Sequence, residues 1–95
     1  MSDNITAPET SEHVTIFYAD WCPFCQRLIS ALNRTETPHA LVDAEAEGTE
    51  NINAWIESVN DGNRIVPTVL YSDGTHATNP PASEVRAKYA ELAGE

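Results

Sequence analysis

The sequence predicts an α/β protein with a mixed four-stranded sheet and three flanking helices, in the order β-α-β-α-β-β-α. Residues 14–18 form a run that is hydrophobic on both faces, as in a central strand covered by helices on both sides. A helical segment and a second short strand follow, and a strand–helix–strand unit of this length is typically parallel and right-handed. An Asp-Gly pair between two later strand-like runs indicates an antiparallel hairpin.

The first half of the chain supplies two strands and two helices. Pro23 suits the first turn of a helix, so we expect the first helix at residues 23–33 and a second strand at residues 39–43. The inward residues of that helix are expected to be Phe24, Leu28, Ile29 and Leu32. An acidic stretch leads into the second helix, and we expect this helix to end at residues 60–63. Its buried stripe follows helical spacing at Ile52, Trp55, Ile56 and Val59.

The second half supplies the hairpin and the last helix. Residues 64–71 contain a strand run that starts at Pro67, and because proline cannot donate to a ladder, we expect Pro67 at the first residue of the strand or at an edge. Asp73 and Gly74 predict a tight primed turn, with residues 76–78 returning. We expect Asn79 to be the N-cap of the last helix and Pro80 its first residue. The inward residues of this helix are expected to be Val85, Tyr89 and Leu92.

Length and charge restrict the class of protein. The 95 residues suffice for one domain, which we place at residues 14–95 after a flexible N-terminal tail at residues 1–13. Five basic and fifteen acidic residues give a net charge of −10, which argues against nucleic-acid binding. This acidity serves solubility or selects against anionic ligands. No signal pattern and no apolar run of about 20 residues is present, so we expect a cytoplasmic protein without a membrane partner.

The two cysteines of the chain, Cys22 and Cys25, form a CxxC motif at the predicted strand-to-helix turn. With Pro23 at the first helical position, Cys22 is the N-cap, where unpaired N–H groups and the helix dipole favour a thiolate. Cys25 lies on the same helix face, about 5–6 Å away between Cβ atoms, and should be more buried and less acidic. We therefore predict that Cys22 is the nucleophile and that Cys25 can resolve, forming a redox-active Cys22–Cys25 disulfide.

Two other interpretations of the motif were weighed. A zinc site needs four ligands, and the three histidines show no ligand spacing to one another, so we expect no metal. A purely structural disulfide is disfavoured because so short a loop constrains the unfolded chain little.

Over about residues 14–93 the chain resembles proteins of the thioredoxin fold, and among them the glutaredoxins. Residues 22–25 (Cys-Pro-Phe-Cys) match the CP[YF]C pattern of dithiol glutaredoxins. The first strand begins only eight residues before Cys22, which leaves no room for the additional N-terminal elements of thioredoxin. Residues 62–67 (Gly-Asn-Arg-Ile-Val-Pro) resemble the G-Q-R-T-V-P segment of glutaredoxins.

This resemblance implies a cis Val66–Pro67 bond, with the Val66 backbone pairing a bound thiol like an added strand. A trans proline at a strand edge is the alternative. Trp21 is expected to serve as a lid or docking surface, or else to have a structural role. The residues expected to bind substrate are Trp21, Pro23, Phe24, Arg64, Val66, Pro67, Thr78 and Asn79. For Thr78 and Asn79 the alternative is a role as turn and cap residues.

The chain also departs from glutaredoxins. Ala19, followed by Asp20, stands where they place a lysine that meets a glutathione carboxylate, and residues 73–80 replace their glycine-rich segment. Arg64 alone would remain to bind a carboxylate. The combination of residues 21–25, 58–64, 66–68 and 73–80 more closely resembles the mycoredoxins of actinobacteria. Their thiol, mycothiol, is neutral apart from its sulfur and needs hydrogen bonds more than ion pairs.

The resemblance implies a thiol–disulfide oxidoreductase that reduces protein–mycothiol mixed disulfides through Cys22, with Cys25 dispensable. It would act in electron transport and redox homeostasis as a monomer, with mycothiol as co-substrate, no bound cofactor, and mycothione reductase acting indirectly. Rivals are a dithiol glutaredoxin, an NrdH-type redoxin, whose W-S-G-F-R-P segment is absent, and an iron–sulfur carrier, which Pro23 disfavours. A non-catalytic binding module is disfavoured by the intact CxxC motif.

Overall fold

The protein was analysed as a computed structural model, which describes residues 7, 8 and 10–94. Its elements are β1 (Val14–Tyr18), α1 (Pro23–Arg34), β2 (Ala40–Asp43), α2 (Glu50–Ser58), β3 (Thr68–Tyr71), β4 (His76–Thr78) and α3 (Ala82–Ala93). This confirms the predicted order. Of the expected flexible tail, residues 1–6 and 9 lie outside the described residues. His13 contacts Ser72 twice, through its carbonyl oxygen at 2.9 Å and its ring Nδ1 at 2.8 Å.

The four strands form one mixed sheet in the order β2-β1-β3-β4. β1 is parallel to β2, whereas β3 is antiparallel to both β1 and β4. At the carboxyl end of the parallel pair, Tyr18 lies opposite Asp43, and the Ala44 N–H donates to the Tyr18 carbonyl at 2.8 Å. The segments that follow β1 and β2 therefore leave the sheet at the same edge.

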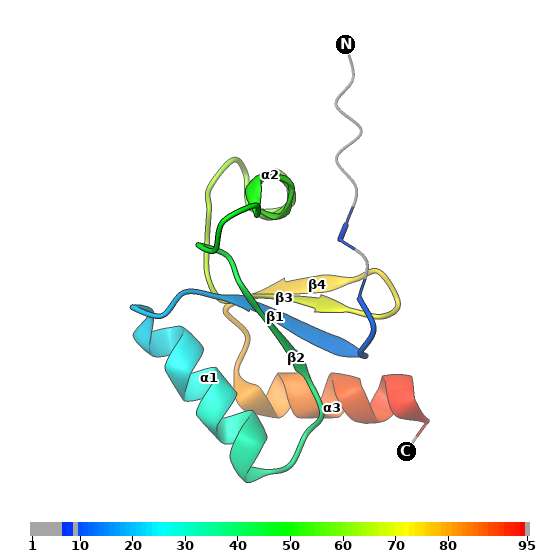
Figure 1. The fold of residues 1–95 in the computed structure, drawn as a ribbon. Coiled ribbons are helices and arrows are strands. Elements are labelled where there is room, and N and C mark those ends of the chain that lie inside the picture. Colours follow the sequence, from blue (N-terminus) through cyan, green and yellow to red (C-terminus); the bar gives the residue numbers. More distant parts are fainter. Residues whose placement is uncertain (1–6, 9, 95) are drawn as a thin grey trace.

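Helices cover both faces of the sheet, as predicted. Figure 1 shows α1 and α3 on one side of the strands and α2 on the other. The buried core under α1 and α3 contains Val14, Ile16, Leu28, Leu32, Val69, Tyr71 and Val85. The core under α2 contains Phe17, Ala44, Trp55, Ile56 and Leu70. Alternate residues of β1 point to opposite cores, which explains why this strand is hydrophobic on both faces.

Three local predictions were wrong. Phe24 does not face inward but is 52% exposed, because Cys25 takes the inward position in the first turn of α1. The turn before β4 is not primed: Gly74 has a φ of +91°, but Asp73 is not among the residues with positive φ, and its carboxylate instead accepts the Thr75 N–H. The third error concerns the start of α3.

α3 begins at Ala82 with Pro81 as its N-cap, two residues later than predicted from Asn79 and Pro80. Asn79 has a φ of +49°, and its N–H donates to the carbonyl of Pro67 at 2.8 Å. Each residue that precedes a proline is driven away from helical geometry, so the Pro80-Pro81 pair delays the helix. Asn79 thus belongs to the loop beside Pro67. In the described part of the chain, no helix has the length and apolar character needed to cross a membrane.

Candidate active site

Cys22 lies at the N-cap of α1, as the sequence predicted. Its φ of −88° and ψ of 110° are extended, and its Sγ accepts the backbone N–H of Cys25 at 3.0 Å. Pro23 occupies the first helical position, where its missing N–H leaves no bond unmade. The sulfur therefore caps an N–H group that has no helical partner, at the positive end of the helix dipole. A helix N-terminus is a position at which negative charge is stabilised.

The loop that precedes β3 lies against the Cys22 thiol. The Val66–Pro67 peptide bond is cis, as the resemblance implied, and the Val66 carbonyl oxygen lies 3.7 Å from Cys22 Sγ. The hydrogen bond from Asn79 N–H to the Pro67 carbonyl fixes this loop to the segment after β4. Cys22 and the Val66–Pro67 loop are more than forty residues apart in sequence, and the fold brings them together at the sulfur.

Cys25 is the second thiol of the motif, and the structure contains both as free thiols. Burial, followed by the hydrogen bond with Cys22, raises the pKa of Cys25 to about 12, so it stays protonated at neutral pH. The raised pKa of Cys25 accords with the prediction that it is the less acidic of the two thiols, and the comparison with Cys22 stays a prediction. The expected contrast in exposure is nearly absent, since Cys22 is 2% exposed and Cys25 is 0% exposed. The two thiols thus differ in hydrogen bonding and surroundings more than in burial.

Two exposed aromatic residues flank the buried Cys22. Trp21 is 65% exposed and Phe24 is 52% exposed, and Pro23 between them is also exposed. The Trp21 indole N–H donates to Glu45 Oε2 at 2.8 Å, which holds the ring against the segment after β2. The apolar rim of the site is therefore formed by neighbours of the thiol in sequence.

Arg64 lies in a polar network that the sequence did not reveal. Its Nη2 contacts Glu45 Oε2 at 3.2 Å and the carbonyl oxygen of Ala44 at 3.4 Å, and its Nε donates to Asn53 Oδ1 at 3.0 Å. Glu45 Oε2 thus accepts from both Trp21 and Arg64. An open hollow of about 420 Å³ lies beside this network. Its lining residues are Ala44, Glu45, Ala46, Thr49, Glu50, Asn53 and Arg64.

Glu45 and Asn53 were missed because the acidic stretch was interpreted only as the approach to α2. One signal could have found Glu45. Parallel β1 and β2 end at the same edge of the sheet, so a charged residue two positions after β2 must lie near the residues that follow β1. Those residues include Trp21.

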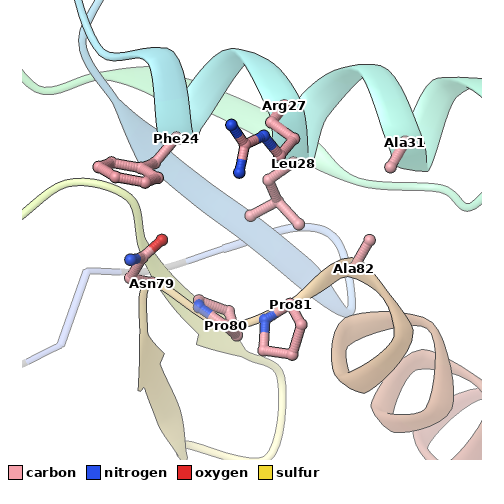
Figure 2. Close-up of a pocket in the computed structure, with 8 residues that line it drawn as sticks. All are labelled: Phe24, Arg27, Leu28, Ala31, Asn79, Pro80, Pro81 and Ala82. Carbon is pink, nitrogen blue, oxygen red and sulfur yellow. The ribbon is translucent and has the colours of Figure 1, made fainter.

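A second hollow, with a volume of about 390 Å³, lies between α1 and the segment that joins β4 to α3. Its lining residues are Phe24, Arg27, Leu28, Ala31, Asn79, Pro80, Pro81 and Ala82. Figure 2 shows the residues of α1 facing those of the segment between β4 and α3 across this pocket. It joins Phe24 and Asn79, two predicted binding residues. It also adds Arg27, whose guanidinium carbon lies 5.8 Å from the centroid of the Phe24 ring. Arg27 is thus a second cation near the predicted binding residues, and the expectation that Arg64 alone would bind a carboxylate stays a prediction.

Thr78 is placed differently from the other predicted contacts. Its hydroxyl donates to Asn60 Oδ1, and the Asn60 amide in turn donates to the carbonyl of Ile56 at 2.8 Å and to Thr68 Oγ1 at 3.3 Å. Thr78 thereby ties β4 to the end of α2. Its structural role is visible in these bonds, whereas contact with a substrate stays a prediction.

These features define a class of protein. Among residues 7, 8 and 10–94, no three His, Cys, Asp or Glu side chains are placed to hold a metal ion. A cysteine that caps a helix, beside a cis-proline loop on a four-stranded mixed sheet, defines a thioredoxin-fold thiol oxidoreductase. The family model described as glutaredoxin matches residues 14–77. The chain belongs to the glutaredoxin family.

Two relatives and two solved structures refine this placement. The chain is 56% identical to Mycoredoxin 1 of Corynebacterium glutamicum over 81 residues, which covers 85% of this chain and 98% of the relative. It is 42% identical to a putative glutaredoxin of Mycobacterium tuberculosis, again over 85% of the chain and 94% of the relative. The fold is shared with a glutaredoxin from Archaeoglobus fulgidus, at a TM-score of 0.64 and 21% identity, covering 88% of each chain. A wheat glutaredoxin matches at a TM-score of 0.60 and 23% identity, covering 88% of this chain and 78% of that one.

Proposed function

We propose that this protein reduces mixed disulfides between proteins and mycothiol by a monothiol mechanism in which Cys22 is the nucleophile. The observation that carries the chemistry is the Cys22 sulfur at the start of α1, where it accepts the Cys25 N–H at 3.0 Å. The choice of mycothiol is supported by the 56% identity to Mycoredoxin 1. It is also supported by Ala19 and Asp20, which offer no positive charge before the thiol.

The proposed reaction is two successive thiol–disulfide exchanges. The Cys22 thiolate attacks the mycothiol sulfur of the mixed disulfide, and a bond between these two sulfurs forms. The bond to the protein sulfur breaks, and that sulfur leaves as a thiolate that takes a proton from water. The thiolate of a second mycothiol then attacks the mycothiol sulfur bound to Cys22. Cys22 leaves as a thiolate, so the protein cysteine ends reduced and mycothiol disulfide is formed, which a mycothione reductase would recycle.

The pocket of about 390 Å³ supports a sugar-bearing thiol. Phe24 offers an exposed aromatic ring, Arg27 offers N–H donors, and Asn79 offers an amide that both donates and accepts. Hydroxyl groups of a glucosamine–inositol body need donors and acceptors of this kind. The pocket borders the helix that Cys22 caps, so it is the site that we assign to the sugar end of mycothiol.

A coupled assay tests the proposal. Purified protein is given a mycothiolated protein substrate with mycothiol and mycothione reductase, and in parallel with glutathione and its reductase or with thioredoxin reductase. We expect turnover with mycothiol to exceed that in the other two systems. Cys22→Ser should lower turnover by at least about a hundredfold, since the nucleophile is lost. Cys25→Ser should keep at least about half, because a thiol that stays protonated takes no part in either exchange.

Other outcomes would overturn specific parts of the proposal. Loss of activity in Cys25→Ser would establish a dithiol route, and faster reduction by thioredoxin reductase would indicate an NrdH-type redoxin. A strong preference for glutathione would overturn the choice of mycothiol. Purified protein that carries the colour of an iron–sulfur cluster would favour a carrier instead.

A further inference from the structure

The carboxylate of Glu45 forms an ion pair with Arg64, on the α2 side of the site. Glu45 Oε2 lies 3.2 Å from Arg64 Nη2 and 2.8 Å from the indole nitrogen of Trp21, the residue before the thiol. This side chain therefore links Arg64, a predicted substrate-binding residue, to the neighbour of Cys22 in sequence. The backbone of Glu45 is held at the end of β2, because its N–H donates to Asp43 Oδ1 at 2.9 Å.

The other contacts of Arg64 leave no complete edge of its guanidinium for a carboxylate. Bidentate binding needs two N–H groups on one edge, and each edge of the group includes either Nε or Nη2. Nε donates to Asn53 Oδ1 at 3.0 Å, and Nη2 contacts both Glu45 and the Ala44 carbonyl. A carboxylate that approached this arginine would have to displace Glu45 and would also be repelled by it.

We infer that Glu45 is a specificity-determining residue that excludes thiols bearing a carboxylate, such as glutathione, by pairing internally with Arg64. The inference rests on the proposed function, since it explains why a thiol without a carboxylate is accepted. Neutral hydroxyl-bearing ligands need no ion pair with Arg64 and are unaffected by its pairing. Glu45 acts on the choice of thiol and takes no part in the exchange of sulfurs.

The size of the effect follows from the exposure of the pair. The side chains of Arg64 and Glu45 are 39% and 40% exposed, so solvent screens their attraction. Replacing Glu45 removes a carboxylate that competes weakly with the ligand carboxylate for Arg64, and it also removes the repulsion between the two carboxylates. We therefore expect a gain of about 3- to 10-fold in the use of glutathione, not a full exchange of specificity.

The test is the substitution Glu45→Gln, assayed with glutathione and with mycothiol on one mixed-disulfide substrate. A glutamine at position 45 still offers an oxygen to the Trp21 N–H but no charge to Arg64. We expect kcat/KM for glutathione to rise about 3- to 10-fold, mainly through KM, and that for mycothiol to stay within about twofold. Glu47→Gln is the matched control, because Glu47 is exposed nearby and its loss changes net charge equally. This control should leave the ratio of the two thiols unchanged.

The double variant Glu45→Gln, Arg64→Gln should lose the gain, because the released arginine is gone. A glutathione gain in Glu45→Gln no larger than that in Glu47→Gln would overturn the inference, as would a gain that survives removal of Arg64. These results are separable from the proposed function. That proposal is overturned if the unmodified protein prefers glutathione to mycothiol, whereas the inference is judged only by the change between variants.

Discussion

The two thiols of the motif lie one helical turn apart and differ in their surroundings. Cys22 accepts a backbone N–H at the start of α1, while burial raises the pKa of Cys25 to about 12. The same four residues therefore hold one sulfur at a helix cap and one buried thiol that stays protonated. The difference comes from helix geometry, since the first position of the motif is the cap and the fourth faces the core.

The raised pKa of Cys25 predicts a loss of stability in alkali. Its folded pKa lies above the reference value of 9.0, so its stabilising effect is complete below about pH 9 and is lost as the pH rises toward 12. The urea midpoint of the reduced protein should fall between pH 8 and pH 10.5, and this fall should be larger for the unmodified chain than for Cys25→Ala. Tyr71, whose pKa burial also raises to about 12, titrates in both proteins. An equal fall in the two would contradict the prediction.

At the scale of elements, Asn60 joins the end of α2 to β3 and β4. It is 8% exposed, and its amide contacts Ile56, Thr68 and Thr78. These bonds hold β3, which begins directly after the Val66–Pro67 loop, and its neighbour β4. The position of that loop beside Cys22 therefore depends on a side chain that lies outside the site.

Asn60→Ala should lower the free energy of unfolding by about 2 kcal/mol, since it removes three contacts and leaves buried partners without bonds. Asn51→Ala is the matched control, because Asn51 is an exposed asparagine on α2, the helix that precedes Asn60. Its effect should stay within about 0.5 kcal/mol. Denaturant unfolding of both variants measures the difference, and equal stabilities would show that the Asn60 bonds carry no net energy.

The structure could be predicted from the sequence where the signal lies in neighbouring residues. Hydrophobic spacing located all three helices, and the Cys22-Pro23 pair placed the cap of α1 correctly. The sequence was insufficient where partners are distant along the chain. The Trp21–Glu45 bond spans 24 positions and the Arg64–Glu45 pair spans 19, and neither leaves a periodic pattern. The start of α3 was missed because the tie from Asn79 to Pro67 competes with the role of a cap.

At the scale of the whole molecule, the net charge of −10 sets a field that opposes anions. Glutathione carries net negative charge, whereas mycothiol is neutral apart from its thiol. Raising the ionic strength from about 10 mM to about 300 mM should therefore increase kcat/KM for glutathione about 2- to 5-fold. That for mycothiol should change much less. A parallel response of the two thiols in a salt series would show that the overall charge plays no part in selection.

The central claim is that the sulfur at the start of α1 is the reactive one. Alkylation of the reduced protein by limiting iodoacetamide at pH 7, followed by peptide mass spectrometry, tests it most directly. The structure predicts that the label accumulates on Cys22 while Cys25 stays unmodified, because the pKa of Cys25 is held near 12. Label on Cys25 before Cys22, or no faster labelling of Cys22 than of the urea-unfolded chain, would contradict the account.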